Sequence, residues 1–236
     1  MRKMLVLLLA MALLLSLSAC GEKEEPASEE KHSSNQADKE TKPTQPEETT
    51  APDAPEREFS IGKVTGQNYE NTFIGIGCTL PEHWTFSTEQ ELLEKVGIYG
   101  ITDREEALVY LEGVPFYYDM SAGFQGDFPT IMIYLKQYNN FALNILKLEN
   151  HYLQILDYFA KEYALDVKNV TGTVEEVQIS GQTVPFLRLR GKQNGMVYYW
   201  SIFCIKCDGY LATVEICTMN KSDARDILNC FYFIEA

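Results

Sequence analysis

The sequence has few basic residues and no apolar run long enough to cross a membrane. Lys and Arg number 20 against 34 Asp and Glu, which gives a formal net charge of −14. A nucleic-acid binder needs a basic face to neutralise phosphates, so this balance argues against nucleic acid as a partner. The longest apolar run, residues 4–15, has 12 residues, whereas a transmembrane helix needs about 20. A membrane-spanning helix is therefore not expected.

Histidine and the common catalytic motifs are also scarce. The three histidines are His32, His83 and His151. A Ser-His-Asp or Cys-His site would need His83 or His151 as its base. The sequence contains no G-x-S-x-G, no H-E-x-x-H and no glycine-rich phosphate loop, which are the local signatures of hydrolases, zinc proteases and nucleotide sites. We expect surface or capping histidines, no cofactor and no enzymatic activity.

The N-terminus has the pattern of a secretory signal peptide over residues 1–19. Arg2 and Lys3 give a positive start, and the short apolar run follows at once. A buried core helix is the alternative, but the next segment offers nothing for such a helix to pack against. The run ends in Leu17-Ser18-Ala19-Cys20.

These four residues resemble the lipobox of bacterial lipoproteins. The resemblance implies that Cys20 receives a diacylglyceryl group and becomes the mature N-terminus after cleavage. Two acyl chains hold a protein stably on a bilayer, whereas one does so only marginally. The implied location is the extracytoplasmic face of the cell membrane, with a lipid anchor. A chance cysteine behind an ordinary signal peptide remains the alternative.

Residues 20–57 are predicted to form the lipidated cysteine and a disordered tether. The segment 21–57 has no Phe, Tyr, Trp, Ile, Leu or Val, and it carries 11 acidic and 5 basic residues. Such a composition cannot bury enough apolar surface to offset the entropy of ordering. Its coil span is roughly 35 Å, which suits a spacer between membrane and domain. An acidic tail that binds cations or a basic partner is the alternative.

Residues 58–236 hold all 12 Phe, all 14 Tyr and both Trp, and we expect a single folded domain here. The early part alternates between strand and helix patterns. A capping box at Ser87-Thr88-Glu89-Gln90 opens the first predicted helix. The ranges expected here are strands 60–69 and 72–80, helices 89–96 and 104–112, an irregular aromatic stretch 113–128, strand 130–138 and helix 143–163.

The last part predicts a four-stranded meander and a final helix. Asn194-Gly195 and Asp208-Gly209 are favoured two-residue hairpin turns. The resulting registry places five side chains on one core face: Phe203, Ile205, Ala212, Val214 and Ile216. The strands expected here are 174–179, 183–191, 197–207 and 210–217, followed by a helix to residue 230 capped by Asn220 or Ser222. Successive hairpin-linked strands with separate helices indicate an α+β fold with an antiparallel sheet.

This layout resembles the PsbP/Mog1-like domains of bacterial surface lipoproteins. The resemblance rests on the segment 79–84, Thr-Leu-Pro-Glu-His-Trp, and on the late meander around residues 179–182. It covers about residues 60–236. It implies an α/β/α sandwich and, because that family is mostly non-enzymatic, a binding function. No individual site residue is implied.

The cysteines other than Cys20 number five, so at least one must stay free or pair between chains. They are Cys78, Cys204, Cys207, Cys217 and Cys230. Cys204 and Cys207 form a C-x-x-C, but positions i and i+3 of a strand point to opposite faces, which argues against a zinc or redox site. The registry also places Cys217 opposite Trp200. Buried free thiols are favoured, and one disulfide involving Cys217 or Cys230 is the alternative.

Two acidic groups invite a functional interpretation and have a simpler structural one. Asp103, Glu105 and Glu106 could form an acid/base cluster or a set of calcium ligands, but acidic residues also stabilise the start of a helix. Glu175-Glu176 suits the solvated edge of a sheet.

The candidate partner-binding residues are Tyr117, Tyr118, Phe124 and Phe128, in the stretch that also contains Gly123 and Gly126. Aromatic loops on rigid scaffolds often bind proteins or glycans; a loop that covers the sheet is the alternative. The predicted function is a non-catalytic surface lipoprotein that binds an envelope or extracellular protein or glycan. The alternatives are an envelope hydrolase using Asp103, Glu105 or His83, and the solute-binding lipoprotein of a transporter.

Overall fold

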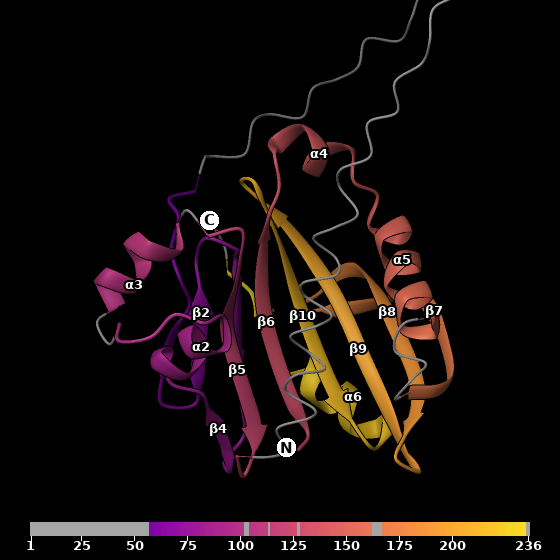
Figure 1. Cartoon of the computed structure of the whole chain (residues 1–236). Helices are drawn as coiled ribbons and strands as arrows, with labels where there is room; N and C mark the ends of the chain where they lie inside the picture. The colour runs from indigo at the N-terminus through magenta and orange to yellow at the C-terminus, as the bar shows by residue number, and fades with distance from the viewer. Residues whose placement is uncertain (1–56, 102–103, 113, 127, 162–166, 235–236) are drawn as a thin grey trace, which may run out of the picture. The chain divides into compact units, whose positions relative to one another are not determined.

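The computed structural model describes residues 57–101, 104–112, 114–126, 128–161 and 167–234. The chain divides into the units Met1–Glu56 and Arg57–Ala236, and the account below concerns the second unit (Figure 1). The expected signal peptide, Cys20 and the tether up to residue 56 lie outside the described residues, whereas Arg57, its last predicted residue, belongs to the second unit and donates its amide to Asp208 at 3.0 Å. No helix in the described part of the chain is both long and apolar enough to span a bilayer.

A seven-stranded antiparallel sheet forms the body of this unit (Figure 1). The strand order is β4-β5-β6-β10-β9-β8-β7. The bounds are β4 Trp84–Phe86, β5 Phe116–Phe124, β6 Thr130–Gln137, β7 Val167–Ile179, β8 Gln182–Gln193, β9 Met196–Cys207 and β10 Tyr210–Thr218. The predicted meander is confirmed, since β7 to β10 pair in sequence order. Asn194 and Gly195 both have positive φ, as their two-residue hairpin requires.

A second sheet of four strands has the order β1-β2-β3-β11. Its strands are β1 Lys63–Thr65, β2 Asn68–Asn71, β3 Ile76–Thr79 and β11 Phe231–Phe233. β11 pairs antiparallel with β3, so the C-terminal segment lies beside the start of the domain. The expected strand 60–69 is therefore two short strands joined by a turn at Gly66, where φ is positive.

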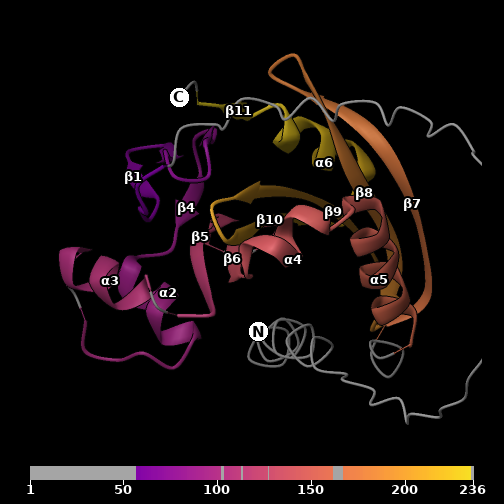
Figure 2. The ribbon, with the colours of Figure 1, turned by 90° about the horizontal axis from the view of Figure 1, so that it is seen from above.

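Helices cover both faces of the large sheet, as Figure 2 shows from above. α5 (Leu148–Lys161) packs on β7 and β8. α6 (Lys221–Leu228) lies on the opposite face, on the side of the small sheet. The shorter helices are α2 Glu89–Lys95, α3 Arg104–Leu111 and α4 Asn140–Ile145. The expected α+β class, with antiparallel sheets packed by helices, is confirmed.

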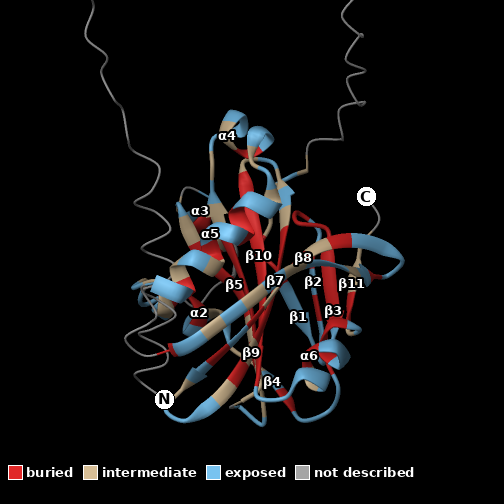
Figure 3. Ribbon diagram, turned by 90° about the vertical axis from the view of Figure 1, so that its right-hand side faces the viewer, coloured by how far each residue is buried: buried red, intermediate tan, exposed pale blue. Residues whose placement is uncertain are grey.

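The main core fills the space between the two sheets and α6. Every residue of β10 is buried, which places this strand at the centre of the domain (Figure 3). Of the predicted core face, Phe203, Ala212, Val214 and Ile216 are buried, and Ile205 is half-buried against them. The alternation of apolar side chains along β9 and β10 therefore identified this face correctly.

Three local predictions are wrong in their bounds. Residues 116–124 form β5 rather than an irregular stretch, because β4 and β6 supply hydrogen-bonding partners on both sides. The helix expected over 143–163 is split into α4 and α5, since Leu146 adopts an extended conformation. The capping box lies one residue later than expected: Thr88 caps α2, and Glu91 bonds back to the Thr88 backbone.

Candidate functional site

A cleft opens between the end of the large sheet and α6. Its volume is about 290 Å³, close to the lower end of the range of roughly 300–1,000 Å³ for ligand pockets. The lining residues come from the β4 entry, the β5–β6 turn and α6 with its following turn. They are Pro81, Trp84, Phe124, Pro129, Asp223, Asp226, Ile227 and Cys230.

The apolar wall of the cleft is built by strand pairing. Trp84 lies opposite Phe124 in the β4–β5 ladder, and their rings meet edge to face with centroids 6.1 Å apart. The Phe124 amide donates to the Pro129 carbonyl at 3.1 Å and holds the turn that follows β5. Trp84 is buried while Phe124 is half-buried, so Phe124 is the more exposed of the two rings in this wall.

The opposite wall is the acidic face of α6. Asn220 caps this helix and accepts from the Ser222 amide at 3.2 Å. Asp223 and Asp226 stand three positions apart, which places both carboxylates on one face of the helix. Ile227, next to them, is buried and extends the apolar floor. The cleft thus combines an aromatic wall with two carboxylates.

The acidic charge of this wall is not neutralised by a close ion pair. The Nε atom of Arg225 lies 4.0 Å from an Asp226 carboxylate oxygen, and both side chains are more than 70% exposed. A pair with this exposure contributes little, since water screens it. None of the described lining residues is basic. Within the described lining, the two carboxylates therefore meet no basic side chain, and the weak pair of Asp226 with Arg225 lies outside the lining.

The cysteines of the described residues are all free thiols. Burial, with the nearby Asp226, raises the pKa of the Cys230 thiol at the cleft. Burial also raises the pKa of Cys204 to about 11 and that of Cys207 to about 12. Cys204 faces Thr213, whereas Cys207 packs against the main core, so this C-x-x-C pair points to opposite faces as expected. Protonated thiols of this kind are poor nucleophiles and poor metal ligands.

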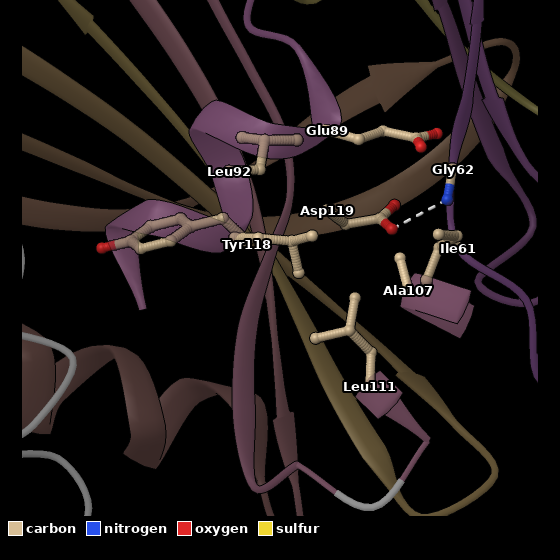
Figure 4. Close-up of a pocket in the computed structure, with 9 residues that line it drawn as sticks. Ile61, Gly62, Glu89, Leu92, Ala107, Leu111, Tyr118 and Asp119 are labelled. Atoms are coloured by element: carbon tan, nitrogen blue, oxygen red, sulfur yellow. Dashed lines mark hydrogen bonds between the residues drawn. The ribbon is translucent and has the colours of Figure 1, made fainter. Parts of the chain in front are cut away.

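A second, much smaller cavity lies between α2, α3 and β5 (Figure 4). Its volume is about 20 Å³, room for about one water molecule. Asp119 borders it and accepts from the Gly62 amide at 2.8 Å, from Asn71 Nδ2 at 2.8 Å and from the Tyr69 hydroxyl. Asp119 occupies a bulge between Tyr118 and Met120. This carboxylate joins the two sheets, and the cavity is too small for a substrate.

Another buried carboxylate, Glu215, lies in the middle of β10. Only 1% of the residue is exposed, and neither carboxylate oxygen has a hydrogen-bond partner among the residues that the structure describes. Burial raises the pKa of Glu215 to about 7. Sequence reasoning missed both Glu215 and Asp119, although an acidic residue inside an apolar strand is a visible signal in each case.

The four aromatic candidates do not gather on one surface. Tyr117 is 1% exposed and belongs to the main core, while Tyr118 is 6% exposed on the other face of the sheet. Phe128 packs against Tyr198, with centroids 5.5 Å apart. Only Phe124 lines the cleft. The loop interpretation is wrong for Tyr117, Tyr118 and Phe124, because all three lie in strand β5. Alternation along this strand sends the neighbours Tyr117 and Tyr118 to opposite faces.

The histidine and acidic candidates are also dispersed. His83 is exposed at the entry to β4, with its ring 6.3 Å from that of Phe124. His151 was expected at the surface but is buried, because it shares the four-residue spacing of Ile155 and Phe159 on α5. Burial and the nearby Lys136 lower the pKa of His151 to about 4.

Most of the acidic group near the start of α3 lies outside the described residues. Asp103 and the Glu105 side chain lie outside the described residues, and Glu106 is exposed. Glu175 and Glu176 are exposed on the edge strand β7, as expected, and Glu175 pairs with Arg188 at 2.8 Å. Within the described ranges, no three His, Cys, Asp or Glu residues are close enough to hold a metal ion.

Comparisons with known proteins give low-identity similarities of fold. No family model matches the sequence, and no curated protein matches it. The chain is similar to the solution structure of PsbP (CyanoP) from Synechocystis sp. PCC 6803, with 11% identity and a TM-score of 0.44, over 75% of this chain and 94% of that chain. It is also similar to LpqN, described as involved in cell envelope biogenesis of Mycobacterium tuberculosis, with 11% identity and a TM-score of 0.36, over 68% and 83% of the two chains.

Proposed function

We propose that this protein is a lipid-anchored envelope lipoprotein whose domain, residues 57–236, binds a ligand without transforming it. The observation that carries the proposal is the cleft of about 290 Å³ between the β4–β5 end and α6. Mostly apolar clefts with a few polar groups are the usual form of a ligand site.

The lipid anchor that the sequence predicts supports the same proposal. Cys20 ends a lipobox-like segment, and an acidic segment without aromatic residues separates it from the domain. A diacylated N-terminus would hold the protein at the membrane. Like charge along the spacer, and repulsion from anionic lipid, would keep the domain and its cleft away from the bilayer.

Replacing the acylated cysteine tests the anchor. Cys20→Ser is expected to move nearly all of the protein from the membrane fraction to the soluble fraction, and to abolish incorporation of labelled palmitate. Cys230→Ser is the matched control and is expected to leave both unchanged. A Cys20→Ser protein that stays in the membrane fraction would contradict the lipoprotein assignment.

Binding is favoured over catalysis by the groups around the cleft. None of the described residues that line it is a histidine, and Cys230, the one thiol among them, has a raised pKa. A nucleophile needs an adjacent base to react at neutral pH. Incubation of the protein with peptide and glycan libraries is expected to give no turnover, and catalytic turnover would overturn the non-catalytic assignment.

A further inference from the structure

The cleft next to α6 has one property that selects among ligands: an aromatic wall faces two carboxylates. Trp84 and Phe124 form the first wall. Asp223, which is half-buried, and Asp226, which is exposed, form the second. The following inference rests on the proposed binding function. It concerns the chemical class of ligand that can interact favourably with both walls at once.

Three ligand classes fit this cleft poorly. An anion would meet two carboxylates, and no basic residue is among the described lining residues. A wholly apolar ligand would remove water from the carboxylates without replacing their hydrogen bonds, which costs free energy. A bare metal ion would find only two carboxylates, and no larger donor group exists among the described residues.

An organic cation satisfies both walls. An ammonium group can donate to the two carboxylates, and such charge-assisted hydrogen bonds are stronger than neutral ones. The faces of Trp and Phe attract a cation, and the same rings bury alkyl carbon. The size of the cleft limits the ligand to a small molecule.

We propose that the cleft binds a small organic cation, whose ammonium group contacts Asp223 and Asp226 while its carbon chain lies on Trp84 and Phe124. Buried Ile227 closes the floor beneath the carbon chain. The half-buried Asp223 contributes more than the exposed Asp226, because water screens its charge less.

The test uses three probes of one shape and three charges: n-pentylammonium, 1-pentanol and pentanoate. They are titrated by calorimetry into the mature lipidated chain in uncharged maltoside micelles. Pentylammonium is expected to bind about tenfold more tightly than 1-pentanol, and pentanoate is expected not to bind. The emission of Trp84 is expected to change on binding. The emission of Trp200, the other tryptophan, is expected to stay constant, because Trp200 is buried and its ring centroid lies 5.2 Å from that of Phe159.

Matched variants locate the site. Asp223→Asn is expected to weaken pentylammonium binding about tenfold, and Phe124→Leu about threefold. Asp157→Asn removes the same charge from α5, on the other face of the sheet, where that carboxylate pairs with exposed Lys161. This control is expected to leave the affinity unchanged.

The outcomes separate this proposal from the proposed function. If 1-pentanol binds as tightly as pentylammonium and alters Trp84 emission, the cleft is a binding site but the cation assignment is wrong. If Asp157→Asn weakens binding as much as Asp223→Asn, the attraction is general and the cation site is wrong. If pentylammonium does not bind at all, the cation site is likewise wrong, while the fractionation and turnover assays test the proposed function independently.

Discussion

Asp119→Ala is expected to lower the free energy of unfolding by about 3 kcal/mol or more. The variant removes the Asp119 acceptor from the Gly62 amide, the Tyr69 hydroxyl and Asn71 Nδ2, of which Asn71 Nδ2 retains its bond to the Ser60 carbonyl at 3.2 Å. Each of these donors is in the interior, where water cannot replace the lost partner, and each orphaned donor costs about 1–3 kcal/mol. Urea denaturation of the variant and the natural chain measures the difference.

Two further variants separate the carboxylate from general packing in this region. Tyr69→Phe removes one of the donors and is expected to cost about 1–2 kcal/mol. Gly62→Ala would place a methyl carbon against the Tyr69 ring and 2.6 Å from an Asp119 carboxylate oxygen, so it is expected to destabilise by crowding. A loss below 1 kcal/mol for Asp119→Ala would show that this network does not hold the two sheets together.

Glu215→Gln is expected to make the protein more stable above neutral pH, and equally stable near pH 4.5. Burial raises the pKa of Glu215 from 4.5 to about 7, so the folded state keeps a proton that the unfolded state releases. Stability from this group is fully present below pH 4.5, falls as the pH rises to about 7 and is lost above that. The shift corresponds to about 3 kcal/mol.

Denaturant unfolding at several pH values between 4.5 and 8 measures this dependence. The difference between Glu215→Gln and the natural chain is expected to grow over this range. His151 changes the free energy of unfolding with pH in the opposite direction. Its lowered pKa makes the stability fall as the pH drops below 6.5 towards about 4. His151 is present in both proteins, so its effect cancels in the difference. Glu176→Gln, on the exposed edge of β7, is the control expected to show no trend; a flat difference for Glu215→Gln would contradict an unpartnered buried carboxylate.

The candidate site could be predicted only in fragments. The sequence indicates Phe124 as a partner-binding candidate and includes Trp84 in the segment 79–84, but no local pattern connects either residue with Asp223. Asp223 lies 99 positions after Phe124 and 139 positions after Trp84 in the sequence. They meet because β4 pairs with β5 and because α6 packs on the core beside them. Periodicity describes one element at a time, so it cannot specify such a meeting.

The sequence by itself determined the features that depend on neighbouring residues. The Asn194-Gly195 and Asp208-Gly209 turns, the order of β7 to β10 and the core face of β9 and β10 all follow from turn chemistry and two-residue alternation. Cys217 lies opposite Trp200 for the same reason, since a two-residue turn sets the register of its hairpin.

Only the tertiary structure decided the rest. β5 became a strand because β4 and β6 flank it, β11 because β3 offers an open edge, and His151 was buried because α5 turns that face towards the sheet. The cleft arose where the end of one sheet meets a helix from the other end of the chain. Hydrogen bonds and burial between distant segments determine these features, and no local pattern of residues encodes which distant segments will meet.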